Sequence, residues 1–281
     1  MKLLLAFCLF LLQTLLFADK NQSSTDDDEP TFAEDLFRKR EFDFGIRGGL
    51  GYKPEDRFES DLKNYKTISS PNEFSTARLS SFRKTTNNEF FARIRLFSHS
   101  KFGFVFGSNY FQNFNITEAS SAGYYSKLDF KLSTDFFFLT YHHIFPFRRF
   151  FIETGLGLGV NTVTWQTSGV SLSRFGYYNQ DGFMVGNGLG YRMDTSINRQ
   201  ISNNFVLQLG LMYNYHTVPS FNGSFNDSFG SFYVRSDGTV APILNSEVQN
   251  SAFETSYASR KLDMRVGNAV VYFGVVFRFS L

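Results

Sequence analysis

The fold of this chain is most constrained by an alternation of apolar and polar residues that returns along most of its length. The alternation is clearest in the last eleven residues, VYFGVVFRFSL, where every odd position from Val271 to Leu281 is large and apolar. The even positions there are mostly small or polar. A period of two is the period of a β-strand with one apolar and one polar face. The sequence therefore predicts an all-β fold.

Seven earlier segments share this alternation, so eight strands are predicted. They are 42–52, 90–96, 102–114, 125–145, 150–165, 183–197, 205–215 and a last strand from about 265. The linkers between them are alternately long and short: 53–88, 98–101, 115–124, 146–149, 166–182, 198–204 and 216–263. Short turns at one end and long loops at the other are typical of an up-and-down transmembrane barrel of antiparallel strands. Ten strands are possible if Asp237 and Gly238 turn a further hairpin within 228–245.

The polar faces of these strands are repeatedly charged, and this favours a particular orientation. A soluble barrel, which keeps apolar residues inside, is the alternative. Charges buried unpaired in a dry interior would cost several kcal/mol each. We therefore expect the apolar faces to meet lipid and the charged faces to line the lumen. The predicted interior network is Asp43, Arg47, Arg93, Arg95, Asp129, Lys131, Asp135, Glu153, Arg192, Asp194 and Arg278.

An eight-stranded ring is just wide enough for side chains to fill it, so these charges should pair across neighbouring strands. We expect Arg93 or Arg95 to pair with Asp129 or Asp135. Glu153 should likewise pair with Arg192. A lumen filled by ion pairs would be plugged rather than open.

The N-terminal segment indicates export. A basic start, an apolar run over 3–17 and a small residue at Ala18 are typical of a secretory signal peptide, so residues 1–18 are expected to be removed near Ala18. An uncleaved anchor is the alternative, but the run falls short of the ~20 residues that a membrane helix needs. We expect 19–40 to be a polar periplasmic lead and 41–281 to be the barrel. Cys8, the single cysteine, lies within the predicted signal peptide.

Five residues of the final strand have a recognisable spacing: Tyr272, Gly274, Phe277, Phe279 and Leu281. This pattern resembles the C-terminal signal by which the assembly machinery of outer membranes selects β-barrel proteins, although the bacterial pattern prefers Phe or Trp at the final position. With its strands and linkers, 41–281 resembles the small eight-stranded outer-membrane barrels of the OmpA, OmpX, OmpW and opacity-protein type. The resemblance implies location in the cell outer membrane, contact with its lipid, and assembly machinery as a partner of the last strand.

A specific function should lie in the external loops, because rigid scaffolds usually carry binding residues on loops. The last linker contains four aromatic residues among Ser, Asn and Gly, which are candidate contacts for host or envelope ligands: Phe221, Phe225, Phe229 and Phe232. We therefore expect a surface-exposed scaffold, adhesin-like or structural in the envelope, with a plugged interior. The alternative is a porin-like or OmpW-like narrow channel or lateral portal for small solutes.

Other function classes find little support in the sequence. A mean hydropathy of −0.20 is too polar for a bundle of membrane helices, and a net charge of +2 without a basic tract gives no reason to expect nucleic acid. Of the four histidines, only His216 is predicted at the external mouth, where a hydrolytic barrel would need a base. The sequence has neither H-E-x-x-H nor G-x-S-x-G. We expect no enzyme, no metal site and no cofactor.

Overall fold

The computed structural model describes residues 41–65, 76–119, 125–147, 150–173, 176–226, 228–244 and 258–280. The predicted signal peptide 1–18, the predicted lead 19–40 and Leu281 lie outside these residues. Within them the chain forms β-strands and one short helix, α3 (Arg57–Leu62). No helix in this part of the chain is long and apolar enough to cross a membrane.

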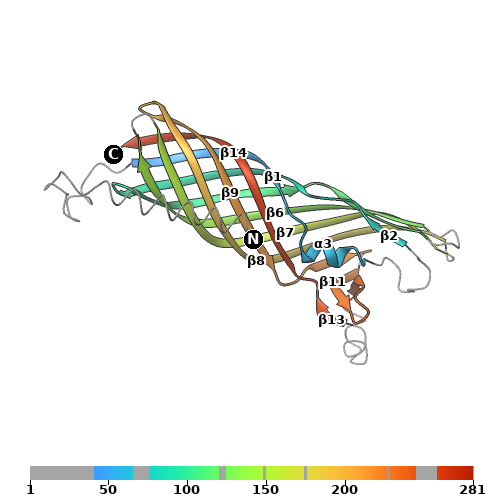
Figure 1. Ribbon diagram of the computed structural model, residues 1–281. Helices are drawn as coiled ribbons and strands as arrows, with labels where there is room; N and C mark the ends of the chain where they lie inside the picture. The colour runs from blue at the N-terminus through green and yellow to red at the C-terminus, as the bar shows by residue number, and fades with distance from the viewer. Residues whose placement is uncertain are drawn as a thin grey trace. The chain divides into compact units, whose positions relative to one another are not determined.

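Eight strands of the described chain close into a ring (Figure 1). They are β1 (Glu41–Tyr52), β3 (Lys84–Phe97), β4 (Ser100–Phe111), β6 (Tyr125–Pro146), β7 (Phe151–Ser173), β8 (Gly176–Ser202), β9 (Phe205–Val218) and β14 (Met264–Ser280). Each strand pairs antiparallel with its neighbours. The ring closes where β14 pairs with β1, from Glu41 opposite Ser280 to Tyr52 opposite Ala269. The predicted all-β antiparallel barrel is confirmed.

The ring has a turn end and a loop end. Short turns join β3 to β4, β6 to β7 and β8 to β9 at the turn end, where β1 begins and β14 ends. The predicted alternation of short and long connections holds, but several linkers are shorter than predicted. Most of 166–182 is strand, and 115–119 and 198–202 are strand as well. The ladder between β7 and β8 continues from Gln166 opposite Phe183 to Ser173 opposite Gly176. The prediction ended these strands too early because a strand that has left the membrane no longer needs an apolar outer face.

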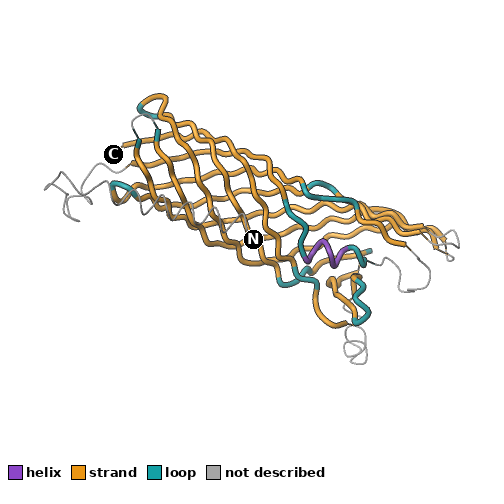
Figure 2. The backbone as a smooth tube through the Cα atoms, in the orientation of Figure 1, coloured by secondary structure: helices purple, strands orange, loops and turns teal. Residues whose placement is uncertain are grey.

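Short strands extend the ring at the loop end, where Figure 2 shows strand continuing beyond the barrel. On one side β5 (Phe114–Ala119) pairs with β6, and β2 (Thr76–Leu79) pairs with β5. On the other side β10 (Asn222–Phe225) joins β8 to β11 (Ser228–Arg235), which pairs with β12 (Val240–Leu244) and β13 (Ala258–Lys261). We call these strands and the outer halves of β6, β7 and β8 the external sheet.

The possible further hairpin within 228–245 is present as β11 and β12, but neither strand enters the ring. Its turn lies at Asp237 and Gly238, as the sequence indicates. Asp237 accepts hydrogen bonds from the backbone N–H and the hydroxyl of Thr239, at 2.9 and 2.7 Å. Gly238 has a φ of 81°, a left-handed conformation that glycine adopts without strain.

The two faces of β1 have the predicted orientation. Ile46 and Leu50 point outward and are 61% and 72% exposed, while Asp43 and Arg47 point inward and are each 3% exposed. The alternation of the sequence therefore becomes an alternation between lipid-facing and lumen-facing side chains in this strand.

The prediction for β6 is wrong in its register. Asp129, Lys131 and Asp135 lie on the outer face and are exposed, whereas Leu128 and Phe130 point inward and are fully buried. Three consecutive phenylalanines at 136–138 make both registers compatible with an apolar outer face, so local sequence does not decide between them. The outer half of β6 belongs to the external sheet, where the outer face meets water and the inner face packs on an apolar cluster.

Candidate functional site in the lumen

The turn-end half of the lumen contains a network of buried ion pairs. Lys101 Nζ lies 2.7 Å from Asp43 Oδ2 and 2.8 Å from Glu153 Oε2. Arg93 forms an ion pair with the same Glu153 carboxylate. Arg278 donates to both oxygens of Asp43, at 2.8 and 3.2 Å. Each carboxylate therefore has two cationic partners, which offsets the cost of removing its charge from water.

A second group of ion pairs lies deeper in the lumen. Arg192 donates to Glu89 Oε1 at 2.6 Å and to Asp194 Oδ2 at 2.8 Å. Arg47 Nη1 lies 3.5 Å from Asp194 Oδ2 and 3.9 Å from Glu89 Oε2. His142 joins the two groups, since its Nδ1 lies 3.3 Å from Glu153 and 3.5 Å from Asp194. The two groups thus form one connected network across several strands.

The sequence identified part of this network and missed the rest. Glu89 lies just before the predicted strand 90–96, Lys101 lies in the predicted turn 98–101, and His142 lies near the end of the predicted strand 125–145. Glu89 is four residues before Arg93 and Lys101 is two before Gly103, so longer strands with the same period of two would have included both. Glu153 pairs with Arg93 and Lys101 rather than with Arg192.

Four predicted members do not lie in the network as expected. Asp129, Lys131 and Asp135 are on the outer surface, so they are not partners of Arg93 or Arg95. Arg95 instead lies near the turn-end mouth, where it donates to Glu41 at 2.9 Å and to the Ser98 carbonyl at 3.0 Å.

An uncharged polar layer lies on the loop-end side of the ion pairs. Asn87 donates to the Asn109 side-chain oxygen at 2.7 Å, and Asn109 lies 2.9 Å from His216 Nε2. Since the Asn109 amide nitrogen is a donor, Nε2 of His216 accepts and Nδ1 carries the hydrogen. His216 is fully buried, with its ring centroid 5.9 Å from that of Phe136. The expectation that His216 lies at the external mouth is therefore wrong, because β9 continues to Val218 and the His216 side chain is fully buried.

A cluster of buried apolar side chains, which we call the apolar cap, lies at the loop end of the lumen. It joins inward side chains of the ring strands to side chains of the loops: Phe58, Leu62, Tyr65, Phe82, Phe111, Phe114, Ile116, Leu128, Phe130, Leu132, Val163, Trp165, Met184, Val218, Phe221, Phe225, Phe232, Val234, Val240, Leu262, Met264 and Val266. Trp165 is at its centre, with ring centroids 4.4 Å from Phe232, 5.4 Å from Phe221 and 5.6 Å from Phe58.

Helix α3 brings Phe58 and Leu62 into the cap. Its N-cap is Asp56, whose carboxylate accepts from the backbone N–H of Glu59 at 2.8 Å. Burial raises the pKa of Asp56, because loss of water disfavours its charged form. Lys53 lies 3.1 Å from both Asp56 and Glu59, so the helix start carries its own ion pairs.

The prediction that the four loop phenylalanines are exposed contacts for ligands is wrong for three of them. Phe221, Phe225 and Phe232 are buried in the apolar cap and are not exposed contact residues. Phe229 alone of the four is exposed, at 71%. The loop composition suggested adaptable binding, but aromatic side chains alternate along β10 and β11 and their inward members fill the lumen mouth.

The outer surface of the ring determines its environment. Large apolar side chains are exposed on every ring strand, including Leu139, Leu158, Leu209 and Phe273 at 52 to 64%. Soluble monomers rarely expose an apolar surface that continues around the whole molecule. The charged residues that face the lumen of the membrane-spanning part, in contrast, are buried and paired. This arrangement is a transmembrane β-barrel of eight strands.

Several solved structures resemble the chain. Neisserial surface protein A is 13% identical, with 85% of this chain and 97% of that chain covered and a TM-score of 0.37. A major outer membrane protein from Thermus thermophilus is 8% identical, with 85% and 99% covered and a TM-score of 0.42. The outer membrane protease OmpT from Escherichia coli is 8% identical, with 86% and 97% covered and a TM-score of 0.40. No protein-family model and no curated protein matches the chain.

The described residues contain no group of three or more His, Cys, Asp or Glu that could hold a metal ion. His216 contacts the side-chain amide of Asn109 and the rings of Phe136 and Phe138. A histidine that acts as a base instead lies beside the hydroxyl or water that it activates.

Proposed function

We propose that this protein is an integral outer-membrane β-barrel with a closed lumen that acts as a surface-exposed scaffold through its external sheet. The observation that carries the proposal is the apolar cap. Trp165 and its aromatic neighbours are fully buried between the ring strands, α3 and β11, so apolar side chains occupy the loop-end mouth. A solute path that begins at the cell surface would have to cross this cluster.

The external sheet offers the surface for contact with partners. Tyr177, Phe183 and Phe229 are exposed there, together with the charged residues Lys131 and Asp181. A shallow cavity of about 330 Å³ lies across β6, β7, β8 and β10 and includes Lys131, Asp181 and Phe183. Aromatic side chains are enriched in protein-binding surfaces, whose rims are polar. Host or envelope ligands are the proposed partners of this surface.

The second candidate is a narrow channel for small solutes. It is favoured by buried polar atoms without a hydrogen-bond partner in the described lumen, among them Nε2 of His142, the Asn161 side-chain amide and the Tyr272 hydroxyl. Such groups favour contact with water, so the lumen below the cap is suited to hydration. The cap would then act as the gate.

Conductance in planar bilayers tests the closed lumen. The full chain should give no discrete openings, while Trp165→Ala, which removes the centre of the cap, should produce them. Phe229→Ala is the matched control, because it removes an exposed aromatic side chain from the same external region and should remain silent. Discrete openings of the unchanged protein would contradict the closed lumen and support the channel.

A further inference from the structure

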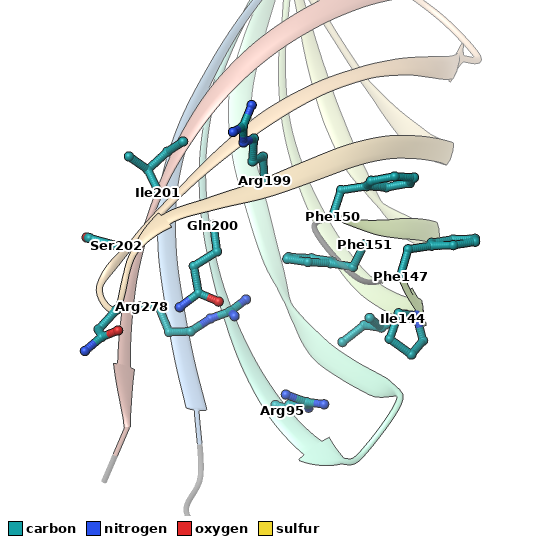
Figure 3. A pocket seen from close by; sticks show the side chains of 12 residues that line it. Arg95, Ile144, Phe147, Phe150, Phe151, Arg199, Gln200, Ile201, Ser202 and Arg278 are labelled. Carbon is teal, nitrogen blue, oxygen red and sulfur yellow. The ribbon is translucent and has the colours of Figure 1, made fainter.

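A cavity of about 600 Å³ opens at the turn end, opposite the apolar cap (Figure 3). It lies between the end of β3, the turn from β6 to β7, the turn from β8 to β9 and the end of β14. Three arginines and three phenylalanines carry the argument below: Arg95, Arg199, Arg278, Phe147, Phe150 and Phe151. We call this cavity the vestibule. We propose that the vestibule binds a small phosphate monoester with an apolar substituent.

The charge of the vestibule favours an anion. The ion pairs at this end of the lumen join four cations, Arg93, Arg95, Lys101 and Arg278, to three carboxylates, Glu41, Asp43 and Glu153. One positive charge is therefore in excess. Arg199 adds another, since it forms no ion pair with any described residue. The deeper group does not offset this excess, because Arg47 and Arg192 are matched there by Glu89 and Asp194.

The guanidinium groups are already oriented. Asp43 holds Arg278 through Nε and Nη2, at 2.8 and 3.2 Å, which leaves Nη1 free of protein bonds in the described chain. The Ser98 carbonyl and Glu41 hold Arg95. A guanidinium fixed in this way loses little conformational entropy when it binds a second acceptor. The planar donors of a guanidinium match the oxygens of a phosphate better than a single ammonium group would.

The opposite wall of the vestibule is apolar and aromatic. Phe147 and Phe150 stack with ring centroids 4.9 Å apart across their turn. The ring of Phe151 faces two of the cations, with its centroid 5.5 Å from the Arg278 guanidinium carbon and 5.2 Å from Lys101 Nζ. Ile144 and Pro146 complete this side. An anion alone would leave the apolar wall unused, whereas an ester with an apolar substituent contacts both walls.

The vestibule lies at the edge of the lipid-facing surface, so two sources of such an ester are possible. Phe147 and Ile201, which line it, are 52% and 58% exposed. A phospholipid headgroup could reach it from the membrane, and a soluble ester could reach it from the aqueous side. The site is at the opposite end from the cap and does not depend on whether the lumen conducts.

Phenyl phosphate is a suitable probe, and phosphorus NMR of the full chain folded in a neutral detergent measures its binding. The unchanged protein should bind phenyl phosphate saturably and more tightly than inorganic phosphate, because the phenyl ring contacts the aromatic wall. Arg199→Gln should weaken binding by about tenfold, since it removes a charge-assisted hydrogen bond without breaking an ion pair. Lys127→Gln, which removes an exposed cation from the external sheet, is the matched control and should leave binding unchanged.

Two results would overturn the proposal. One is the absence of saturable binding of phenyl phosphate at millimolar concentration. The other is unchanged binding in both Arg199→Gln and Arg95→Gln. The source is distinguished by repeating the titration in phosphatidylcholine nanodiscs with and without phosphatidic acid, whose headgroup is a phosphate monoester. Competition by phosphatidic acid supports a lipid headgroup as the occupant, and equal binding in both supports a soluble ester.

Discussion

Glu153 and Asp129 occupy polar positions of alternating strands but lie in opposite environments. Glu153 is buried between Arg93 and Lys101, while Asp129 is exposed on the outer face of β6. The same side-chain charge therefore has different consequences for stability. A carboxylate with two buried cationic partners is integral to the lumen, whereas an exposed one is already solvated by water.

Glu153→Gln should lower the free energy of unfolding by about 3–5 kcal/mol, because it leaves Arg93 and Lys101 buried with one fewer anion. Asp129→Asn is the matched control and should change the free energy by less than about 0.5 kcal/mol. Urea titration of the folded band on unheated gels measures both. Equal destabilisation by the two substitutions would show that Glu153 is not a buried partner of these cations.

Phe232, which lies in the apolar cap, and Phe229, which is exposed on the same strand, allow a similar comparison. Trp165 is the single tryptophan of the chain, so its fluorescence reports on the cap alone. Phe232→Ala should lower the free energy of unfolding by about 3–5 kcal/mol and increase the quenching of Trp165 by acrylamide, because it opens a cavity beside the indole ring. Phe229→Ala should change neither quantity. Strong quenching in the unchanged protein would contradict a buried Trp165.

At the scale of the element, β6 is one strand in two environments. Toward the turn end its outward residues, including Leu139 and Tyr141, face lipid, and its inward residues line the lumen. Toward the loop end its outward residues include Lys131, and Leu132 points into the cap. Its register is continuous with that of β7 from Tyr125 to Pro146. The surroundings change along β6 while its alternation does not.

Cysteine labelling tests this register in a Cys8→Ser background. Lys131→Cys should react with a water-soluble maleimide, whereas Leu132→Cys should be protected, because neighbouring residues of a strand point to opposite faces. A fluorescent label on Leu139→Cys should be quenched by brominated lipids, and one on Lys131→Cys should not. The reverse pattern at 131 and 132 would restore the register in which Lys131 lines the lumen.

The outer part of the hairpin formed by β7 and β8 belongs to the external sheet, and none of its described residues within 169–180 lies in the apolar cap. Deletion of 169–180 and replacement by Asn-Gly should leave the barrel folded, because Ser168 and Asp181 are already paired and a two-residue turn can join them. Retention of heat-modifiable gel migration measures this. Loss of the folded band would show that the outer hairpin is required for the ring.

At the scale of the whole molecule, the ring depends on β14, which pairs with β9 on one side and β1 on the other. Phe273, Phe277 and Phe279 face outward from this strand, while Tyr272 and Arg278 face inward. We propose that the assembly machinery recognises this strand. Closure leaves no ring edge with unpaired backbone groups in lipid, where each such group would cost several kcal/mol.

Truncation before Phe273 should abolish heat-modifiable migration, because it removes the turn-end half of β14 and opens edges on β1 and β9. The deletion of 169–180 is its control, since it shortens the chain by a similar length without opening the ring. The heat-modifiable gel migration of both variants is measured after folding in detergent and after expression in cells. A truncated chain that still migrates as a folded band in detergent would contradict the requirement for closure.

The period of two and the closed antiparallel barrel could be predicted from the amino-acid sequence, because alternation and linker length are local properties of the chain. The same alternation correctly predicted inward positions for Asp43, Arg47, Arg93, Glu153, Arg192, Asp194 and Arg278. The partners of these charges, the register of β6 and the burial of Phe221, Phe225 and Phe232 could not be predicted in this way. Which face of a strand is buried depends on what surrounds it at each height, and the surroundings of β6 change from lipid to water along its length. Partner choice depends on side chains from strands far apart in sequence, which a local pattern does not contain.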